Sequence, residues 1–516
     1  MKNFVYIILV LMGGAMMPLS GQAEQPADMM TGLDGRAAAP QLGPEDMAAD
    51  LDDALTFTKY PTYPQYDSMM RYFASTWPEI CRLDTIGTSI EGRLLLALKI
   101  SDNVEEEEDE PALFYSSTIH GDELVGYILS LRLIDFILNN YGENVEIDRI
   151  VDDLEIWINP LANPDGAYYP DNDMSVAASR RENVNNIDLN RNYPSAHYNQ
   201  SDDTTGRQQE TKVMMEFMRQ IRPNLSANFH SGEEVVNYPW DHKEERHPDN
   251  EWFILISREY TDVAHSVDPT YMEGDGFENG ITNGYDWYYV YGGRQDYVTY
   301  YLQGREVTLE LYYNFRAPSE SLDHYWNVNQ WSLINYITQA RYGIHGKVVT
   351  AGSGEPVEAK IWVADHDNDS SWIMSDPVTG NFYRYLKEGV YDLVVSSDAS
   401  PDTTIIGVQV ADYAMTELLV ELDTAGTRGR EGVYAEQFRL FPNPAGNLVT
   451  IRSSLPFSNS SFITLYDLTG RKVYRNALPE GHVTFSIPVH DFAEGVYVVE
   501  VSKGDGERHT ELLKVD

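Results

Sequence analysis

The chain has 516 residues, of which 42% are hydrophobic and 23% are charged, a composition typical of folded globular proteins. This length exceeds one ordinary hydrophobic core and predicts three or four domains. The 81 Asp and Glu residues outnumber the 37 Lys and Arg residues, giving a formal net charge of −44. Such a surface repels nucleic acid and attracts cations, including basic peptides, so we expect no nucleic-acid partner. Cys81 is the only cysteine, which excludes an intramolecular disulfide.

The N-terminal segment has the layout of a secretory signal. Lys2 precedes an apolar stretch from Phe4 to Met17, and small residues ending in "GQA" follow. This layout predicts a cleavable signal peptide over residues 1–23. The stretch is too short for a membrane span and no second one follows, so we expect no transmembrane span in the mature protein. Residues 24–52 lack hydrophobic periodicity and predict a flexible leader.

Strand-like and helix-like segments alternate between residues 53 and 342. The strand-like runs are "LLLALKIS", "ALFYSSTI", "LEIWINPL", "LSANFH" and "EVTLELYY". The helix-like segments between them cover residues 123–140, 207–221, 250–264 and 327–342. This alternation predicts an α/β domain with a largely parallel or mixed sheet. Two of the apolar runs lead into polar clusters at their C-terminal ends, where open α/β sheets usually bind ligands.

The character of the sequence changes after residue 342. Residues 343–423 contain only short alternating strands, such as "AKIWVAD" and "GVYDLVVS", and predict a small β-sandwich. The segment "TAGTRGREG" then indicates a linker over residues 424–433. Residues 434–516 again contain short strands and turns, which predict a second small all-β sandwich.

Three residues of the α/β region have the pattern of a metal site. In "TIHGDELVGYILSLRLIDFILNN" (residues 118–140), His120 and Glu123 stand three apart where a strand turns into a helix. His230 closes the apolar run "LSANFH". Two histidines and a glutamate form one of the ligand sets of zinc peptidases, so we expect one zinc ion per chain. The alternative is that Asp122 or Glu123 simply stabilises the helix N-terminus electrostatically.

Other polar groups accompany these three residues. Glu310 lies between leucines in "EVTLELYY", where a buried acid costs several kcal/mol unless it is paired or functional. The segment "SRRENVNNIDLNRNYP" packs arginines and asparagines around a short apolar step, which suits hydrogen bonding to a carboxylate. The turn "INPLANPDG" is typical of an active site.

From about residue 55 to 342 the chain resembles the zinc metallocarboxypeptidases of the carboxypeptidase A superfamily, most closely the carboxypeptidase D, E and N branch. The resemblance rests on several ordered motifs, which are "YPTYPQYDSM", "IGTSIEGRLLLALKIS", "IHGDE", "NPDG", "DLNRNYP", "LSANFHSG", "NYPWD", "WYYVYGGRQD" and "EVTLEL". It implies a mixed-sheet catalytic domain that hydrolyses the C-terminal peptide bond of peptides and proteins.

The resemblance also assigns roles to individual residues. It makes His120, Glu123 and His230 the zinc ligands, and Glu310 the general base and acid. Arg181 takes the place of the arginine that polarises the scissile carbonyl, with Arg180 as the less favoured occupant.

Substrate-binding residues follow from the same resemblance. Asn190 and Arg191 would bind the C-terminal carboxylate of the substrate, and Tyr288 would close over it. Asp241 and Gln295 occupy the positions that form a pocket for Lys or Arg in this branch, which implies a preference for basic C-terminal residues. An aspartate at the floor of such a pocket pairs with a cation and disfavours an apolar side chain.

Two positions depart from the branch. Ser231 stands where the branch usually has the first Gly of His-Gly-Gly, but serine also occurs there in the pancreatic branch. Arg294 stands where the branch often has Met, and we expect it to add a positive charge near the pocket.

The C-terminal regions carry resemblances of their own. Residues 343–423 resemble the transthyretin-like sandwich that follows the catalytic domain in the same branch. Residues 434–516, with "FRLFPNPAGNLVTIRSS" and "GVYVVEV", look like the type A sorting domain of the type IX secretion system. This implies recognition by the type IX machinery and export across the outer membrane of a Gram-negative bacterium, to the cell surface or the medium.

Two other functions stay open from the sequence. The same fold could act on neutral C-terminal residues or on cell-wall peptides. The chain could also be a non-catalytic surface binding module, although inactive relatives typically lose a metal ligand or the general base, and this chain keeps them all.

Overall fold

The computed structural model describes most of the chain from residue 40 onward. The described residues are 40–423, apart from 107, 275–276, 278 and 399, and the stretches 438–441, 448–453, 461–467, 470–479, 482, 484–490, 492–493, 495–502 and 508–515. The predicted signal peptide and linker lie outside them. Among the described residues, no helix is long and apolar enough to cross a membrane.

An eight-stranded mixed sheet forms the centre of the first region, in the order β1-β2-β4-β3-β5-β8-β6-β7. Its strands are β1 (Cys81–Thr88), β2 (Leu94–Ile100), β3 (Ala112–Ser117), β4 (Glu155–Asn159), β5 (Leu225–His230), β6 (Glu233–Tyr238), β7 (Ile281–Asn283) and β8 (Arg305–Tyr312). The pairs β4–β3, β3–β5 and β5–β8 are parallel, whereas β1–β2, β2–β4 and β6–β8 are antiparallel. The prediction of a mixed-sheet α/β domain is confirmed.

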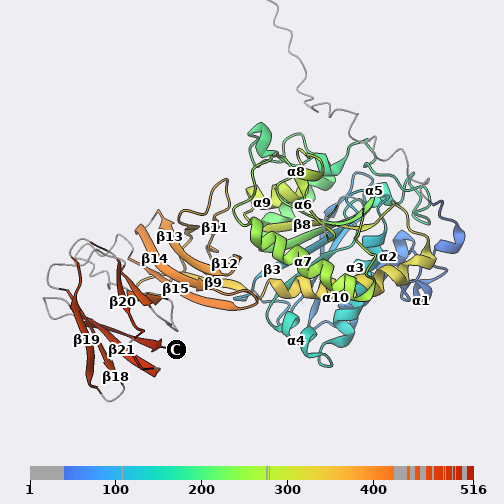
Figure 1. Ribbon diagram of the computed structural model, residues 1–516. Helices are drawn as coiled ribbons and strands as arrows, with labels where there is room; N and C mark the ends of the chain where they lie inside the picture. The colour runs from blue at the N-terminus through green and yellow to red at the C-terminus, as the bar shows by residue number, and fades with distance from the viewer. Residues whose placement is uncertain are drawn as a thin grey trace, which may run out of the picture. The chain divides into compact units, whose positions relative to one another are not determined.

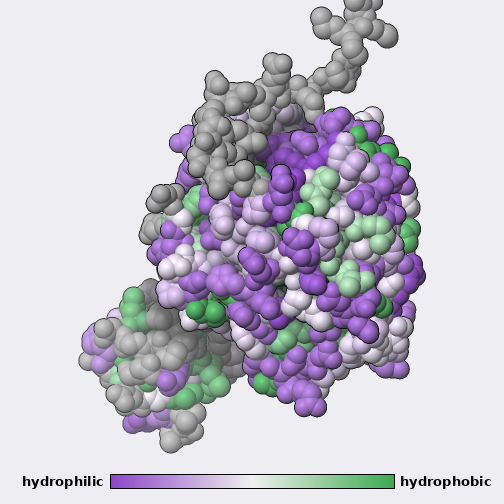
Figure 2. Space-filling view, turned by 90° about the vertical axis from the view of Figure 1, so that its right-hand side faces the viewer, coloured by the Kyte–Doolittle hydropathy of each residue, from purple (hydrophilic) through white to green (hydrophobic). Residues whose placement is uncertain are grey.

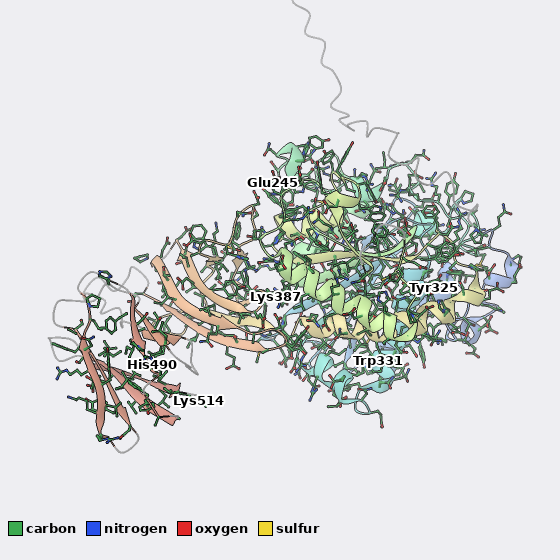
Figure 3. All side chains as sticks on the ribbon, viewed as in Figure 1. Glu245, Tyr325, Trp331, Lys387, His490 and Lys514 are labelled. Atoms are coloured by element: carbon green, nitrogen blue, oxygen red, sulfur yellow. The ribbon has the colours of Figure 1, made fainter. Side chains whose placement is uncertain are left out.

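Helices cover both faces of this sheet (Figure 1). They are α1 (Leu51–Ala54), α2 (Tyr63–Thr76), α3 (Val125–Asn140), α4 (Val145–Asp152), α5 (Pro164–Ala167), α6 (Gln209–Ile221), α7 (Asn250–Val267), α8 (Gly284–Trp287), α9 (Arg294–Tyr301) and α10 (Leu322–Gln339). The larger hydrophobic core lies between one face and α2, α3, α4, α7 and α10. A smaller core lies on the other face, against α6 and α9. Figure 3 labels Tyr325 and Trp331 on α10.

The flexible leader predicted to end at residue 52 extends too far. Leu42 and Ala48 are buried in the larger core, and the Asp46 carboxylate accepts hydrogen bonds from the backbone N–H groups of Gly43 and Ser319. These contacts hold residues 40–52 against the α/β region. The apolar residues of this segment follow neither a helical nor a strand period, because a short 3-10 helix and α1 interrupt it.

A β-sandwich follows α10, drawn in orange in Figure 1. Its two sheets have the orders β11-β10-β13-β14 and β12-β9-β15, and they share one hydrophobic core. The strands are β9 (Gly343–Thr350), β10 (Lys360–Val363), β11 (Ile373–Met374), β12 (Asn381–Arg384), β13 (Gly389–Ser397), β14 (Ser400–Val410) and β15 (Met415–Leu422). The β9–β15 pair is parallel, and the others are antiparallel.

The C-terminal region also forms two small sheets around a common core, β16-β17-β20 and β19-β18-β21-β22. The strands are β16 (Phe438–Phe441), β17 (Leu448–Ser453), β18 (Phe462–Asp467), β19 (Lys472–Ala477), β20 (Thr484–Pro488), β21 (Gly495–Ser502) and β22 (Arg508–Val515). All of their pairings are antiparallel. The face of the molecule in Figure 2 is mostly hydrophilic, as the charge composition predicts.

Candidate active site

Three side chains from two neighbouring strand ends converge on one point. His120 and Glu123 follow β3, and His230 is the last residue of β5, which pairs with β3. The Nδ1 atoms of the two histidines lie 3.1 Å apart, and each lies 2.8 Å from one oxygen of Glu123. All three side chains are buried. Parallel strands end at the same edge of a sheet, which explains how residues so far apart in sequence meet here.

The outer nitrogens of both histidines face hydrogen-bond acceptors. His120 Nε2 lies 3.0 Å from an Asp188 carboxylate oxygen, and His230 Nε2 contacts the side-chain oxygen of Asn228. Both Nε2 atoms therefore carry the hydrogen, which leaves the Nδ1 lone pairs free. Burial also lowers the pKa of His230 to about 4, so this imidazole is neutral at neutral pH. Two free Nδ1 atoms and a carboxylate within 4.8 Å of one another fit a zinc ion.

The structure gives Glu123 specific partners in addition to its position just before the N-terminus of α3. The N-cap residue of α3 is Leu124, whose side chain makes no capping hydrogen bond. Glu123 accepts a hydrogen bond from the backbone N–H of Ser231, in addition to its contacts with the two histidines. Asp122 is half-buried, and burial followed by the charge of Glu123 raises its pKa to about 6.

The two neighbouring arginines, Arg180 and Arg181, have different surroundings. Arg181 donates to Glu123 at 3.1 Å and to Asp188 at 3.0 and 3.1 Å, so it lies beside the three converging residues. Arg180 lies over the ring of Tyr169 at 4.0 Å, and its guanidinium donates into the loop that follows it. Only Arg181 is therefore placed to reach a group bound at the metal position.

The remaining predicted residues surround the same point. Glu310 is buried on β8 and lies next to His230 in the parallel register of β5 and β8. Asn190 and Arg191 lie in a short 3-10 helix (Leu189–Arg191), and the Asn190 backbone N–H donates to Asp188, which contacts His120. The sheet therefore brings Glu310 to the site, and the loop that follows Arg181 brings Asn190 and Arg191 to it.

Tyr288 directly follows α8 and is half-buried. Burial raises its pKa to about 12, with opposing contributions from the nearby charges of Arg191 and Glu310. The phenol therefore stays protonated at neutral pH and can donate a hydrogen bond.

Asp241 and Gln295 belong to a second buried polar group, which also contains Asn237. Gln295 Nε2 donates to Asp241 Oδ1 at 2.9 Å, and Asn237 Nδ2 donates to the same oxygen at 3.1 Å. The Asp241 backbone N–H donates to Asp296, which is also 2.7 Å from His242 Nδ1. Burial, followed by the charge of Asp296, raises the pKa of Asp241 well above its usual value.

Arg294 does not bring an uncompensated positive charge to this polar group. Its side chain is 1% exposed, and its Nη2 donates to Glu306 at 3.0 Å. The guanidinium also lies 4.8 Å from the centre of the Phe114 ring. The expectation of an added charge near the pocket therefore fails, because Glu306 pairs with the guanidinium.

Sequence reasoning missed three residues of this site. Asp188 connects His120 to Arg181, Asn228 contacts His230, and Asn237 contacts Asp241. Each stands two or four residues from a predicted residue within a quoted motif. Strand periodicity indicates that Asn228 and His230 share a face of β5, but the partners of Asp188 and Asn237 follow only from the fold.

A second cluster of buried charges lies outside this site. Asp249, which is fully buried, contacts Arg305 at 2.8 Å, Arg384 at 2.7 and 2.9 Å, and His366 at 2.8 Å. Arg384 also contacts Asp367 at 2.6 Å. Every charge of this cluster has an opposite partner, so the cluster has the arrangement of a structural ionic network.

Comparison with known proteins decides the family. The zinc carboxypeptidase family model matches residues 66–332. The chain belongs to the zinc carboxypeptidase family. It is thus a metallocarboxypeptidase. A second family model, for a secretion system C-terminal sorting domain, matches residues 439–514.

Individual relatives agree with this family. Carboxypeptidase SOL1 of Arabidopsis thaliana is 32% identical over 380 residues, which cover 72% of this chain and 74% of the relative. Human carboxypeptidase D is 34% identical over 350 residues, which cover 65% of this chain but only 25% of that longer protein. The crystal structure of thrombin activatable fibrinolysis inhibitor shares the fold, with a TM-score of 0.50 and 18% identity over 58% of this chain and 79% of that chain.

Proposed function

We propose that this zinc carboxypeptidase is secreted and removes C-terminal Lys or Arg residues from peptides and proteins. The observation that carries the basic preference is the Asp241 carboxylate, which is 5% exposed and has no ion-pair partner among the described residues. A buried carboxylate without a cation is costly, and a cationic side chain of the substrate would supply the missing partner.

The neighbours of Asp241 support the same preference. The side-chain oxygens of Asn237 and Gln295 are buried and accept no hydrogen bond within the described part of the chain. Together with the carboxylate they form a pocket floor made of acceptors. An ammonium or guanidinium group carries only donors, so it satisfies these acceptors, whereas an apolar side chain would leave them unpaired.

His120, Glu123 and His230 would hold the zinc ion, since their ligand atoms lie within 4.8 Å of one another. When bound, zinc would activate a water molecule and polarise the peptide carbonyl. Glu310 accepts a proton at its carboxylate and returns it to the leaving amine nitrogen, a task that suits an acid next to His230. Arg181 donates to the carbonyl oxygen as negative charge develops there.

The loop residues account for exopeptidase action. Asn190 and Arg191 bind the free C-terminal carboxylate by charge-assisted hydrogen bonds, and Tyr288 covers the bound residue. An internal peptide bond brings no carboxylate and leaves Arg191 without its anion. Peptide C-termini are therefore the substrates that this arrangement favours.

The C-terminal sorting domain supports export of the chain to the cell surface or the medium. We infer that the signal peptide of residues 1–23 directs passage across the inner membrane and that the type IX machinery of a Gram-negative bacterium recognises residues 434–516.

A peptide panel tests this function. Peptides that differ only in the C-terminal residue are assayed with and without a metal chelator, and one peptide ending in Arg is also tested as its C-terminal amide. We expect chelator-sensitive release of Lys and Arg, little release of neutral residues, and no cleavage of the amide. Equal or preferred release of neutral residues, or of residues from cell-wall peptides, would overturn the basic preference, and protein that binds no zinc would overturn the metal site.

A further inference from the structure

One face of β5 and β8 carries a row of polar side chains that runs from the interior to the active site. The polar ladder, as we name this row, consists of the register pairs Ser226–Glu306, Asn228–Thr308 and His230–Glu310. The residues between them, such as Ala227 and Leu309, point into the larger hydrophobic core. Because side chains alternate between the faces of a strand, the ladder places Glu306 two steps below Glu310.

Hydrogen bonds connect the ladder to His230. The His230 Nε2–H group donates to the side-chain oxygen of Asn228, at 2.5 Å. The amide nitrogen of Asn228 donates in turn to Glu306 Oε1 at 3.0 Å. The other oxygen of Glu306 accepts from Arg294 Nη2 at 3.0 Å and from the Ser226 hydroxyl at 2.6 Å. An unbroken path therefore leads from Arg294 on α9 to His230.

The ion pair at the inner end of this path is fully buried. Glu306 is 0% exposed, and Arg294 provides the one ion pair that the described residues give it. Such a pair contributes little to stability on balance, because removing two charges from water offsets their attraction. The pair lies at the inner end of the hydrogen-bond path to His230, which points to a role in positioning that residue.

We propose that Arg294 and Glu306 are positioning residues that hold His230 in the geometry required for zinc binding. The Glu306 carboxylate polarises the Asn228 amide, and the amide oxygen then accepts more strongly from His230. That hydrogen bond fixes the ring orientation and increases the electron density available at Nδ1. The inference rests on the proposed role of His230 as a zinc ligand.

Arg294 also connects the proposed metal ligand His230 to the loop that contains Asn190. The backbone N–H of Arg294 donates to the side-chain oxygen of Asn190 at 2.8 Å, and the next residue, Gln295, contacts Asp241. The start of α9 thus links the proposed carboxylate-binding residue, the pocket floor and the metal ligand. Changes at Arg294 should affect zinc binding even though its side chain is remote from the substrate.

Four proteins test the proposal: the wild type and the variants Glu306→Gln, Arg294→Met and the double variant. The zinc dissociation constant is measured by competition with a chelator, and the melting temperature is measured on zinc-free protein. We expect each single variant to bind zinc about 10-fold more weakly, the lower end of the effect of removing an outer partner of a metal ligand. Arg294→Met should weaken zinc binding because the buried Glu306 carboxylate, without its cation, takes up a proton.

The double variant separates positioning from stability. It contains no unpaired buried charge, so its melting temperature should recover relative to Arg294→Met, while its zinc affinity stays low. Lys99→Met is the control, because it removes the cation of another ion pair, between the buried Lys99 and the half-buried Glu155 at 2.7 Å, and this pair has no hydrogen-bond path to His230 among the described contacts.

Two results would count against the inference. Single variants that bind zinc as tightly as the wild type would overturn it, and so would a double variant that regains wild-type zinc affinity together with its stability. A wild-type protein that binds no zinc would instead refute the proposed metal site itself.

Discussion

Asp249 and Asp241 lie only eight residues apart and are both buried, but their surroundings are opposite. Asp249 contacts two arginines and a histidine, whereas Asp241 contacts two amides and lies near a second acid, Asp296. The first acid is matched by charges of the protein itself, and the second is not. The comparison teaches that burial alone does not separate a structural acid from a binding acid, whereas the presence of an internal cation does.

The largest expected effect is on folding, for Asp249→Ala. The substitution leaves Arg305 and Arg384 buried without their anion, which should lower the free energy of unfolding by about 3–5 kcal/mol. Denaturant unfolding of both proteins measures the loss. Asp241→Ala is the matched control, since it removes a buried acid that has no cation, and we expect a smaller loss of about 1–3 kcal/mol because only the neutral donors of Gln295 and Asn237 lose their acceptor. Equal losses for the two variants would erase the contrast.

The second prediction concerns catalysis by Asp241→Asn. The neutral amide keeps the shape of the side chain but cannot pair with a cation, so kcat/KM for C-terminal Arg should fall about 100-fold or more, or about 3 kcal/mol. Hydrolysis of a peptide with a neutral C-terminal residue and the melting temperature should not fall. A variant that lost activity on both peptides equally would show that Asp241 supports the fold or the chemistry and not the specificity.

Gly284 offers a finer test of the pocket. A Cβ atom at this position would lie 1.8 Å from Asp241 Oδ1, so Gly284→Ala must displace the carboxylate. We expect kcat/KM for C-terminal Arg to fall about 10-fold, or about 1.4 kcal/mol. Gly274→Ala is the matched control, because a Cβ there meets its nearest atom at 3.5 Å. If the two alanine variants had the same activity, the position of the Asp241 carboxylate would not govern specificity.

The smallest effect is a pH dependence. Burial and Asp296 raise the pKa of Asp241, so below this pKa the free enzyme holds the carboxyl protonated, and a cationic substrate binds only after the proton leaves. Affinity for C-terminal Arg should therefore rise with pH, by at most about tenfold per unit, until the pH passes the raised pKa.

Stability should change with pH in the opposite direction. A raised pKa in the folded state stabilises the protein at low pH, and this contribution is lost as the pH rises through the folded pKa. Asp241→Asn should therefore gain stability relative to the wild type with increasing pH. Binding titrations and unfolding curves of both proteins at several pH values measure these trends, and parallel curves for the two proteins would contradict them.

The sequence predicted β2, β3, β4, β5 and β8 of the eight-stranded sheet because these strands are largely apolar runs, whereas β6 and the three-residue β7 were not predicted. It also predicted that His120, Glu123 and His230 lie at strand ends, since the ends of parallel strands meet at one edge. These inferences need only local patterns and one general rule of topology.

What the sequence did not predict depends on pairing between distant residues. Asp249 and Arg384 are 135 residues apart, and neither lies in a motif that names its partner. Arg294 was expected to add a positive charge near the pocket, because its pairing with Glu306 depends on the packing of α9 against β8, which no local pattern shows. The burial of Leu42 and Ala48 was missed for a similar reason, since isolated apolar residues give no periodic signal.

The two-residue period of the polar ladder also limits how this protein can change over evolution. A point substitution at one step alters one side chain and leaves the others in place. Insertion or deletion of a single residue within β5 or β8 would turn every later side chain of that strand to the opposite face of the sheet. His230 or Glu310 would then point into the larger hydrophobic core, and an apolar neighbour would face the active site. Length variants of this enzyme should therefore be tolerated in its loops and eliminated between residues 225 and 230 and between 305 and 310.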